Sequence, residues 1–586
     1  MQYPKIPLAQ TIVLLCKAKN IQHIVISPGS RNAPVTIGFT HDDYFTCYSI
    51  VDERCAAFFA LGIAQQIQKP VAVVCSSGSA LLNYYPAIAE AYYSHIPLVV
   101  LSADRPKHLI GIGDGQTINQ TDVYKNHIIY TANLSSQMDA EFKNRDEDEP
   151  AILKTLENKL ERFLGRKQEL QQENETEINK ALNKALSKRG PVHINMPFHE
   201  PLYELTDTLS VNPKIIELNK RASKVDDFIY NECLDAWNSA AKKMVLVGVN
   251  PPNELEQKWL DELVKDNSVI VFTETTSNIH NPGLFNSIDT MIAPLEEDDF
   301  KALQPDILLT FGGLVVSKKI KAFLRSYQPK QHWHIDRDYA NDTFFCLEKH
   351  IETTPNNFFE TFLPQITHFV KSDYKATWEQ IRHYRKEKHS NYLNEIPFSD
   401  FQVFEALFKS LPHNLALQLG NSSTIRYAQL FDIHKSINVF CNRGTSGIDG
   451  STSTAIGCAV GQEKQTVLIT GDLSFFYDSN ALWNNYIPNN FRIIIVNNQG
   501  GGIFRILPGN KDSENFENFF ETTHDFTAKQ LATMYGFQYG TAANAIQLKN
   551  KLKDFYKESD QPKILEIFTP RTENDEVLLN YFKFIK

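Results

Sequence analysis

Thr466-Val467-Leu468-Ile469-Thr470-Gly471-Asp472 is the stretch that decides the fold of this 586-residue chain. A continuous run of β-branched and aliphatic residues is followed at once by a glycine and an aspartate, which is typical of a buried parallel strand that ends in a loop. A second such run ends in Val496-Asn497-Asn498-Gln499-Gly500-Gly501. Because open α/β sheets bind ligands at the carboxyl ends of their strands, we expect Asp472 and Asn498 to share one site.

Strand-like and helix-like segments alternate along the whole chain. The strand-like runs are apolar throughout, which indicates parallel sheets that are buried on both faces. The sequence therefore predicts an α/β fold, with three doubly wound domains whose sheets are mostly parallel, at 1–205, 206–385 and 386–586. The expected strands are 22–27, 71–75, 97–102, 190–195, 243–249, 268–272, 306–311, 332–335, 438–441, 466–470, 491–496 and 561–567, and the expected helices are 52–68, 79–93, 452–460 and 479–486.

Composition narrows the class of partner. The net charge is −10 and there is no long basic tract, which argues against nucleic acid or an anionic membrane as the main partner. No segment reaches the roughly 20 apolar residues that a membrane helix requires, and the N-terminal MQYPKIPLAQ does not read as a secretory leader. We therefore expect a cytoplasmic protein without an integral membrane segment. The eight cysteines include no C-x-x-C pair, so neither a disulfide framework nor a zinc knuckle is indicated.

The two strand-end loops carry ligands that suit a hard divalent ion. The Asp472 carboxylate, the Asn498 amide oxygen and the backbone carbonyl of Gly500 would supply oxygen ligands for the octahedral geometry that Mg²⁺ prefers. Taken singly, each loop is more simply an ordinary strand-to-helix turn. Together, at this separation, the two loops resemble the signature of thiamine-diphosphate-dependent enzymes, and this resemblance favours the metal site.

Motifs in the N-terminal third match the same class of enzyme. Glu53 stands in Asp52-Glu53-Arg54-Cys55 at the start of an expected helix, where the helix dipole alone would also favour an acidic residue. The motif Ser76-Ser77-Gly78-Ser79-Ala80 follows it. Together with Asp472 and Asn498, these motifs resemble the thiamine-diphosphate-dependent enzymes. Leu473 departs from the usual Gly-Asp-Gly of that superfamily, as it does in one of its branches.

The resemblance implies a cofactor, a metal and an assembly. Asp472, Asn498 and Gly500 would bind the Mg²⁺ (or Mn²⁺) that holds the diphosphate, and Glu53 would hydrogen-bond the aminopyrimidine ring so that the ring can take the thiazolium proton. The three domains would be pyrimidine-binding, central and diphosphate-binding, and a homodimer or a dimer of dimers would pair them. Further implied cofactor contacts are Ser77, Gly78, Ile448, Gly471, Ser474, Ile503 and Phe504; core packing explains the three apolar ones about as well.

Four longer motifs are similar to one branch of the superfamily. This branch comprises the succinyl-transferring synthases of menaquinone biosynthesis, which decarboxylate 2-oxoglutarate and add the succinyl group to isochorismate by a conjugate (Stetter-like) addition. The resemblance covers nearly the whole chain. The motifs are Ile26-Ser27-Pro28-Gly29-Ser30-Arg31-Asn32-Ala33-Pro34, Asp104-Arg105-Pro106, Gly420-Asn421-Ser422 with Arg426, and Asn442-Arg443-Gly444 with Gly447-Ile448-Asp449-Gly450.

The branch implies how the substrates would be held. Both substrates carry carboxylates, and planar guanidinium groups bind such anions through paired hydrogen bonds. A single arginine is more simply explained as part of a surface ion pair, but arginines in several matching motifs favour a site. The implied substrate contacts are Ser30, Arg31, Arg105, Lys318, Asn421, Ser422 and Arg426, and the implied catalytic residues are Glu53, Gln116 and Arg443.

Several alternatives stay open beside this interpretation. An acetohydroxyacid-synthase-like carboligase shares the cofactor motifs without the arginines, and a non-catalytic thiamine-fold scaffold would not need Glu53. His332 and His334 would lie on one face of a strand, but without a third ligand a structural role is favoured over a metal site. The charged stretch 139–188 is expected to be a solvated helical excursion of the first domain.

Overall fold

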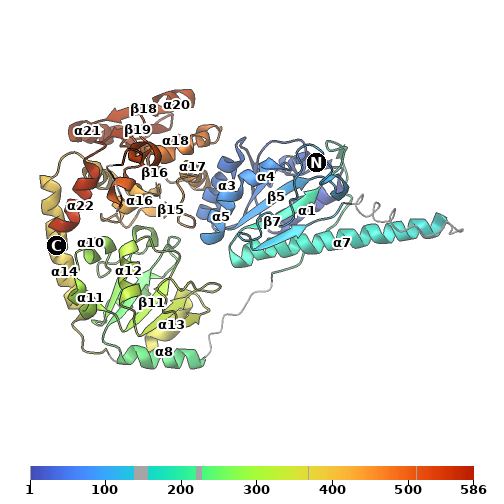
Figure 1. Cartoon of the computed structure of the whole chain (residues 1–586). Coiled ribbons are helices and arrows are strands. Elements are labelled where there is room, and N and C mark those ends of the chain that lie inside the picture. Colours follow the sequence, from blue (N-terminus) through green and yellow to red (C-terminus); the bar gives the residue numbers. More distant parts are fainter. Residues whose placement is uncertain are drawn as a thin grey trace. The chain divides into compact units, whose positions relative to one another are not determined.

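The computed structural model of the chain describes residues 2–136, 156–218, 227–366, 369–507, 509, 511 and 513–586. Within these residues the strands form three parallel sheets and one short antiparallel pair, β1 (Tyr3–Pro4) with β8 (Leu205–Thr206) (Figure 1). This confirms the predicted α/β class. The chain divides into two compact units, the first comprising Met1–Lys220, Gly444–Glu463 and Asp478–Pro488 and the second Arg221–Arg443, Lys464–Tyr477 and Asn489–Lys586.

The first unit is built on a six-stranded parallel sheet in the order β3-β2-β4-β5-β7-β6. Every residue of β4 and β5 is buried, as expected for central strands with helices on both faces. One apolar cluster joins the sheet to α1 (Pro7–Ala18), α2 (Ala33–Thr40) and α7 (Leu156–Lys188), and α3 (Glu53–Ile67) and α5 (Tyr85–Tyr93) pack elsewhere in the same unit. The strands are β2 (His23–Ile26), β3 (Thr46–Ser49), β4 (Val71–Cys75), β5 (Leu98–Asp104), β6 (Tyr130–Asn133) and β7 (Val192–Pro197).

The second unit contains the central sheet, in the order β10-β9-β11-β12-β13, with an apolar cluster on each face. One cluster includes α8 (Asp227–Ser239), α9 (Gln257–Leu263) and α13 (Pro355–Phe362), and the other α10 (Ile288–Ile292), α12 (Lys318–Ser326) and α14 (Tyr374–Glu395). The strands are β9 (Lys243–Val247), β10 (Val269–Thr273), β11 (Ile307–Phe311), β12 (Gln331–Ile335) and β13 (Lys349–Ile351), and α11 (Glu297–Leu303) contributes Leu303 to the second cluster.

The same unit contains the third sheet, in the order β15-β14-β16-β17-β19-β18. Its largest apolar cluster joins the strands to α15 (Asp400–Ser410), α16 (Ser423–Ala428), α21 (Ala545–Phe555) and α22 (Asn574–Phe584). The strands are β14 (Ala416–Leu419), β15 (Asn438–Cys441), β16 (Thr466–Gly471), β17 (Arg492–Asn497), β18 (Gln538–Ala542) and β19 (Lys563–Phe568), and the short helices are α4 (Ser79–Asn83) in the first unit and α18 (Asp472–Tyr477), α19 (Ile503–Ile506) and α20 (Lys529–Met534) in the second.

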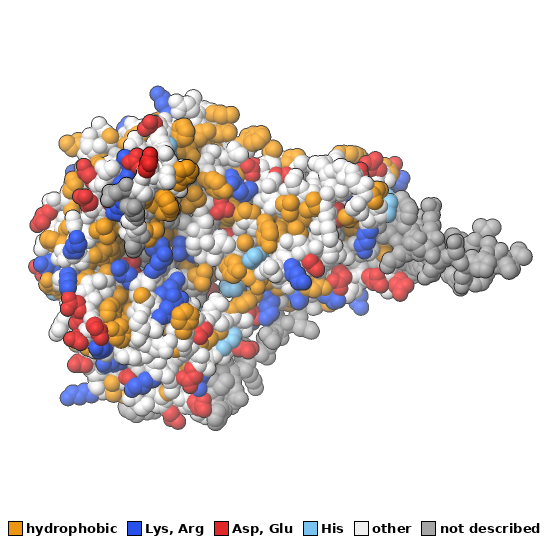
Figure 2. Space-filling model, in the orientation of Figure 1, with side chains coloured by type: hydrophobic (Ala, Val, Ile, Leu, Met, Phe, Trp, Pro, Cys, Tyr) orange, Lys and Arg blue, Asp and Glu red, His pale blue; other side chains and the backbone are white. Residues whose placement is uncertain are grey.

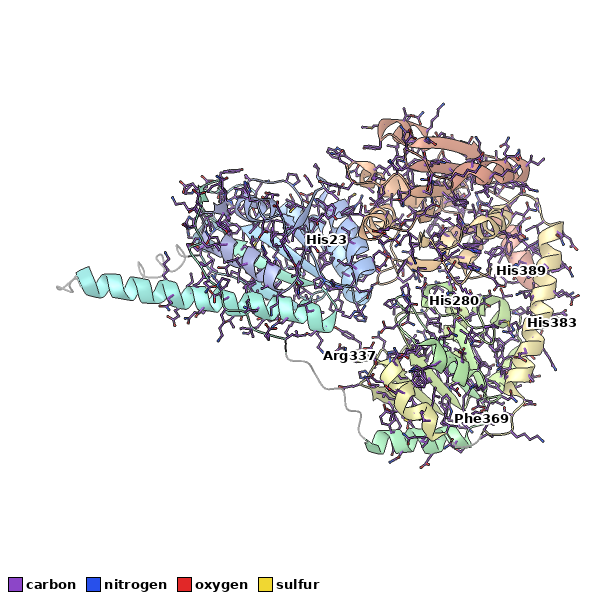
Figure 3. The ribbon with its side chains drawn as sticks, turned by 180° about the vertical axis from the view of Figure 1, so that it is seen from behind. His23, His280, Arg337, Phe369, His383 and His389 are labelled. Carbon is purple, nitrogen blue, oxygen red and sulfur yellow. The ribbon has the colours of Figure 1, made fainter. Side chains whose placement is uncertain are left out.

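Side chains tie the central and third sheets into one unit. His389 on α14, labelled in Figure 3, hydrogen-bonds through Nδ1 with the Tyr581 hydroxyl at 2.8 Å, and that hydroxyl lies 3.2 Å from Thr290 Oγ1 on α10. The Asn278 side chain bonds the backbone of Val439 in both directions, at 2.8 and 2.9 Å. The three sheets fall inside the predicted domains, while the exact boundaries stay a prediction.

Helix α17 (Ser451–Gly461) belongs to the first unit, where it packs against α3 with the two backbones in contact. A Cβ atom at Gly62 would lie 2.1 Å from the carbonyl oxygen of Thr454, and one at Gly457 would lie 2.0 Å from that of Phe59. Only glycine fits at these two positions. The close packing of α3 against α17 therefore depends on these two glycines. The pattern of apolar residues in the sequence does not predict this contact.

Two predicted helices differ in the structure, and several strands were not predicted. The expected helix 479–486 is a single 3-10 turn, Ser479–Leu482, because the Asn484 side chain bonds the backbone of Ala481 and Tyr486 in place of a helical ladder. The expected helix 79–93 divides into α4 and α5 at Tyr84, two residues before Pro86, which has no backbone N–H to donate. Strands β1, β3, β6, β8, β13, β14 and β18 were not predicted.

The charged stretch 139–188 is not solvated throughout. Its first part lies outside the described residues, and α7 occupies the rest. Ile178, Ala181, Leu182 and Ala185 on α7 are fully buried in the apolar cluster of the first sheet. Their i, i+3, i+4, i+7 spacing is that of an amphipathic helix, and the abundant charges around them obscured it.

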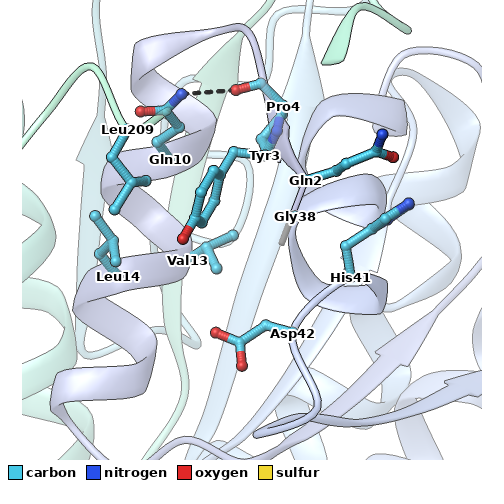
Figure 4. Close-up of a pocket in the computed structure, with 10 residues that line it drawn as sticks. All are labelled: Gln2, Tyr3, Pro4, Gln10, Val13, Leu14, Gly38, His41, Asp42 and Leu209. Carbon is cyan, nitrogen blue, oxygen red and sulfur yellow. Dashed lines mark hydrogen bonds between the residues drawn. The ribbon is translucent and has the colours of Figure 1, made fainter. Parts of the chain in front are cut away.

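Other features of the described residues bear on the predictions. None of their helices has the length and apolarity of a membrane span. All eight cysteines are free. A small hollow in the first unit lies between α1 and α2, where the Gln10 side chain donates to the Pro4 carbonyl at 2.8 Å (Figure 4). None of the predicted site residues lines it.

Candidate active site

Asp472 joins the two predicted loops at the carboxyl edge of the third sheet. It directly follows β16 and is 2 % exposed. Its Oδ1 accepts from the backbone N–H of Leu473 at 2.7 Å, and its Oδ2 accepts from that of Gly500 at 2.9 Å. The structure therefore brings the Gly-Asp loop and the Asn-Asn loop together, as the sequence predicts.

Asn498 follows β17 and has its amide held from one side. Its Nδ2 donates to Asp400 Oδ2 at 3.0 Å, and no described residue donates to its Oδ1. Gly500 has a φ of 149° and no room for a side chain, since a Cβ atom would lie 2.8 Å from the Glu521 carbonyl oxygen. A carboxylate, an amide oxygen and a glycine carbonyl are the kinds of ligand that Mg²⁺ or Mn²⁺ prefers, so these residues fit a divalent ion.

His524 was missed in the sequence and lies beside the metal motif. Its Nε2 is 3.4 Å from Asp472 Oδ2, and the hydrogen bond and charge of Asp472 raise the pKa of the imidazole. Its ring stacks on Phe526, and its backbone N–H donates to the Gln499 carbonyl at 3.3 Å. No short motif marks this histidine, because it reaches the site through a loop that closes back from the chain beyond Gly500.

There is open space beside the backbone at the end of β16, where the metal motif begins. A Cβ atom at Gly471 would meet nothing within 4 Å, so the strand end has open space beside it for a ligand. Ser474 on α18 is buried, whereas Phe504 on α19 is 40 % exposed, and Ile503 begins the same short helix. The buried Glu521 pairs with Arg505 at 2.5–2.7 Å and fixes the loop that carries these residues.

A second group of predicted residues forms a cationic cluster in the second unit. Arg443 donates from Nη1 to Asn421 Oδ1 at 2.7 Å, and Asn421 Nδ2 donates to the Asn442 carbonyl at 2.7 Å. Burial and then the neighbouring Arg443 lower the pKa of Arg426, while Asp289 opposes the shift. Ser422 adopts a φ of 69° where α16 begins. Figure 2 shows Lys and Arg side chains gathered on one face of this unit.

Two residues that the sequence did not single out complete this cluster. Glu274 is buried and accepts from the backbone N–H groups of Val316 and Ser317, both at 2.7 Å, and burial raises its pKa to about 7. Burial lowers the pKa of Lys321, which Glu274 counteracts. Lys318, the predicted residue, is the exposed first residue of the same helix. The cluster thus contains more positive than negative groups, which suits an anionic ligand.

Glu53 occupies the predicted helix start in the first unit. Asp52 caps α3 by accepting from the Cys55 N–H at 3.1 Å, which leaves Glu53 as the first helical residue. Glu53 Oε2 accepts from Asn83 Nδ2 at 3.2 Å. The carboxylate is thus oriented by one amide while it remains partly accessible to a ligand.

Other predicted residues of the first unit surround Arg105. Its Nη1 donates to Ser77 Oγ at 3.2 Å and its Nη2 to the Gly115 carbonyl at 3.0 Å, and Ser77 Oγ donates to the Gln116 carbonyl at 2.9 Å. Gly78 has a φ of 80°, and a Cβ atom there would lie 3.1 Å from the Gln116 carbonyl oxygen. These contacts fold the Gly115–Gln116 turn onto the motif that begins at Ser76.

Arg31 lies close enough to Arg105 for their charges to interact. Burial and then Arg105 lower the pKa of Arg31, while Glu200, at 3.6 Å from its Nη2, opposes the shift. Its Nη1 donates to the Phe198 carbonyl at 3.1 Å. Ser30, next to it, is exposed.

The loop that carries Ile448 is anchored by a residue the sequence did not reveal. The buried Glu90 on α5 accepts from the backbone N–H groups of Gly444 and Thr445, both at 2.7 Å, and from the hydroxyls of Thr445 and Ser94 at 2.9 and 2.7 Å. Ile448 itself is 38 % exposed. A single acidic residue inside an apolar helix gives no sign in the sequence of what it binds.

The predicted residues therefore divide between the two units, and their individual roles stay predictions. His332 and His334 hydrogen-bond the hydroxyl of Thr310 at 2.9 and 2.8 Å, which is a structural arrangement. The first unit contains Ser30, Arg31, Glu53, Ser77, Gly78, Arg105, Gln116 and Ile448, and the second contains Lys318, Asn421, Ser422, Arg426, Arg443, Gly471, Asp472, Ser474, Asn498, Gly500, Ile503 and Phe504.

Comparisons with known proteins match both ends of the chain. The N-terminal TPP-binding domain of thiamine pyrophosphate enzymes matches residues 6–124, and the C-terminal TPP-binding domain matches residues 420–567. Proteins named 2-succinyl-5-enolpyruvyl-6-hydroxy-3-cyclohexene-1-carboxylate synthase are 57 % identical in Christiangramia forsetii, 55 % in Flavobacterium psychrophilum and 53 % in Flavobacterium johnsoniae. Each alignment covers 100 % of this chain and 100 % of the relative.

Proposed function

The chain belongs to the 2-succinyl-5-enolpyruvyl-6-hydroxy-3-cyclohexene-1-carboxylate synthase family, and we propose how its residues perform that family's reaction. It is a thiamine-diphosphate-dependent transferase of menaquinone biosynthesis, which decarboxylates 2-oxoglutarate and adds the succinyl group to isochorismate. The full-length identity to three synthases carries this conclusion, because the matches span the whole chain, including both cofactor-binding domains.

The residues at the edge of the third sheet would hold the metal and the diphosphate. Asp472, Asn498 and the Gly500 carbonyl supply three oxygen ligands for Mg²⁺ or Mn²⁺, and diphosphate oxygens and water would complete the coordination. The cofactor, when bound, stabilises negative charge at the former carbonyl carbon of the 2-oxo acid. The residues that we assign to cofactor contacts are Ser77, Gly78, Ile448, Gly471, Ser474, Ile503 and Phe504.

Glu53 is the proposed proton-handling residue. Its carboxyl group would protonate the ring nitrogen of the aminopyrimidine, and the Asn83 amide at 3.2 Å holds it in one orientation. A group that exchanges a proton with a ring nitrogen must keep one oxygen open to the ligand, and Glu53 uses only Oε2 for Asn83.

The cationic residues would bind the substrate carboxylates. The guanidinium groups lie in two pairs, Arg31 with Arg105 in one unit and Arg426 with Arg443 in the other. Burial or a neighbouring guanidinium strengthens the attraction of each pair for an anion. Gln116 and Arg443 are assigned to the reacting end of the substrates. Ser30, Lys318, Asn421 and Ser422 are the proposed polar partners.

A homodimer, or a dimer of such dimers, is the proposed assembly. Pairing the Glu53 group of one chain with the Asp472 group of another would complete each active site, which is the reason to expect a symmetric dimer. Pyrimidine-binding, central and diphosphate-binding domains at 1–205, 206–385 and 386–586 follow from the same proposal.

The reaction can be tested directly with purified protein. Thiamine diphosphate, Mg²⁺, 2-oxoglutarate and isochorismate are supplied, and loss of isochorismate absorbance is followed. We expect consumption that depends on all four additions. Folded, cofactor-bound protein that consumes no isochorismate would exclude the assignment, and bound flavin with acetohydroxyacid formation would instead support an acetohydroxyacid-synthase-like enzyme.

A further inference from the structure

Two adjacent asparagines at the end of β17 are each held by a buried carboxylate. Asn497 donates from Nδ2 to Glu566 Oε1 at 2.8 Å, and Asn498 donates from Nδ2 to Asp400 Oδ2 at 3.0 Å. Successive side chains at the end of a strand point to opposite faces, so the two amides need different partners. The Asn-Asn pair is therefore matched by two acidic residues from distant parts of the chain.

The two amides differ in whether a donor already occupies their side-chain oxygen. Asn497 Oδ1 accepts from the Gln499 N–H at 3.0 Å, and its Nδ2 also donates to the Phe526 carbonyl at 3.1 Å, so this side chain is used entirely in shaping the turn. Asn498 donates to Asp400, and within the described part of the chain nothing donates to its Oδ1. Only Asn498 keeps an amide oxygen for a ligand.

Asp400 is itself held firmly in place. It is the first residue of α15 and is 3 % exposed. Its Oδ1 accepts from Thr569 Oγ1 at 2.6 Å, and its backbone N–H donates to Asn574 Oδ1 at 2.8 Å. With Oδ1 occupied by Thr569, its Oδ2 is the oxygen that faces Asn498.

The chemistry of this contact decides which way the Asn498 amide points. An ionised carboxylate only accepts hydrogen bonds, so the NH₂ group of the amide must turn toward Asp400 and the oxygen must turn away. A metal ion binds the oxygen and is repelled by the NH₂ group. A reversed amide would place the wrong atom toward the ion.

We propose that Asp400 is a positioning residue that keeps the Asn498 amide oxygen directed toward the divalent cation. This inference rests on the proposed role of Asn498 as a metal ligand. Residues that orient metal ligands typically contribute roughly 10- to 100-fold to metal affinity. Asp400 acts only through Asn498 and does not touch the ion.

The test measures Mn²⁺ binding, not turnover. Purified protein with a fixed concentration of thiamine diphosphate is titrated with Mn²⁺, and the electron paramagnetic resonance signal of free Mn²⁺ gives the Kd. In Asp400→Asn the new NH₂ group can face Asn498 and let its amide reverse, so the Kd should rise roughly tenfold or more. Asp400→Glu keeps an acceptor-only carboxylate and should recover at least part of this loss.

Glu566→Gln is the matched control. It alters a buried carboxylate that holds the neighbouring amide in the same way, at Asn497, and its Mn²⁺ Kd should stay within about threefold of wild type. An unchanged Kd in Asp400→Asn, or an equal rise in both variants, would overturn the proposal. Unfolding temperatures without cofactor identify general damage, which would appear as a loss of stability before any metal is added.

Asn498→Ala separates this inference from the proposal on which it rests. If Asn498→Ala weakens Mn²⁺ binding and Asp400→Asn does not, the role of Asp400 is wrong and the metal site stands. If Asn498→Ala itself leaves the Kd unchanged, the assignment of Asn498 as a ligand is wrong, and the inference falls with it.

Discussion

At the scale of the residue, Glu53 can be tested by a substitution that removes its acidic proton and is expected to leave the fold intact. In Glu53→Gln the amide can still bond Asn83, so cofactor binding should be retained, but the side chain can no longer exchange a proton. We expect exchange of the thiazolium proton to slow roughly 100-fold or more, as measured by deuterium exchange in quenched samples.

Asn83→Ala provides the comparison for Glu53. It removes the orienting amide and keeps the carboxylate, so its loss in exchange rate should be much smaller than that of Glu53→Gln. Equal exchange rates in Glu53→Gln and wild type would remove Glu53 from its proposed role.

Glu274 should make stability depend on pH in a distinctive direction. Burial raises its pKa to about 7 from an ordinary 4.5, so between these values the folded protein retains a proton that the unfolded chain has lost. This carboxyl therefore lowers stability as pH rises from about 4.5 to 7, and above that range its cost is complete. Relative to wild type, Glu274→Gln should gain on the order of 2 kcal/mol between pH 5 and pH 8.

The measurement for Glu274 is a comparison of unfolding temperatures across that pH range. Glu558→Gln, which alters an exposed carboxylate, is the control and should run parallel to wild type at every pH. A constant offset between Glu274→Gln and wild type would contradict the proposed cause, because loss of the two backbone hydrogen bonds alone does not vary with pH.

The residue scale also shows where sequence reasoning ends. Asp472, Asn498 and Gly500 could be predicted because they lie in the loops that follow two apolar strands, and the structure places Asp472 and Gly500 in contact. The carboxylates that support the site could not, because Asp400 reaches Asn498 across 98 residues of sequence and Glu90 reaches Gly444 across 354. Spacing within a motif carries no information on such contacts.

At the scale of the element, the contact between α3 and α17 makes a prediction of unusual sign. Alanine normally stabilises a helix by about 1 kcal/mol relative to glycine. At Gly457 the new Cβ atom would lie 2.0 Å from the Phe59 carbonyl oxygen, so the helices must separate. We expect Gly457→Ala to destabilise the protein by about 1–3 kcal/mol, measured by denaturant unfolding.

Gly540→Ala is the control for this contact, because the nearest atom to its Cβ would be 3.9 Å away. It should leave the unfolding midpoint nearly unchanged. A stabilised Gly457→Ala would show that the two helices do not pack through their backbones.

The same scale explains which elements could be predicted. Strands such as β4 and β16 are recognisable because every residue is apolar or β-branched, and their predicted ends agree with the structure to within one residue. Strand β3 has two exposed residues among its four, and β18 has one buried residue among its five, so neither forms a continuous apolar run. The buried face of α7 escaped notice because its outer face is densely charged.

At the scale of the whole molecule, the proposed dimer can be tested by combining two inactive chains. Glu53→Gln and Asp472→Ala each disable one group of residues. In a mixed dimer whose sites draw one group from each chain, one site contains neither substitution, so mixing should restore roughly a quarter of wild-type activity after random exchange. Activity is followed by isochorismate consumption, and the mass by light scattering should be at least twice the 66.9 kDa of the chain.

Separate refolding of each variant gives the baseline for the mixing experiment. If each active site were formed within a single chain, no combination of these two variants would regain activity. Restoration without mixing would show instead that one substitution is not disabling.

The anchoring of the 444–450 loop by Glu90 has a consequence for how this enzyme can change over generations. The Glu90 carboxylate binds the loop only through the backbone N–H groups of Gly444 and Thr445 and the hydroxyl of Thr445. It therefore fixes the path of the backbone whatever side chains follow. Position 448 can then be exchanged by a single mutation without a change in the backbone path of the loop. Glu90 thereby keeps the path of this loop while the side chain at position 448 changes, and libraries that aim at other 2-oxo acids should vary position 448 and leave Glu90 untouched.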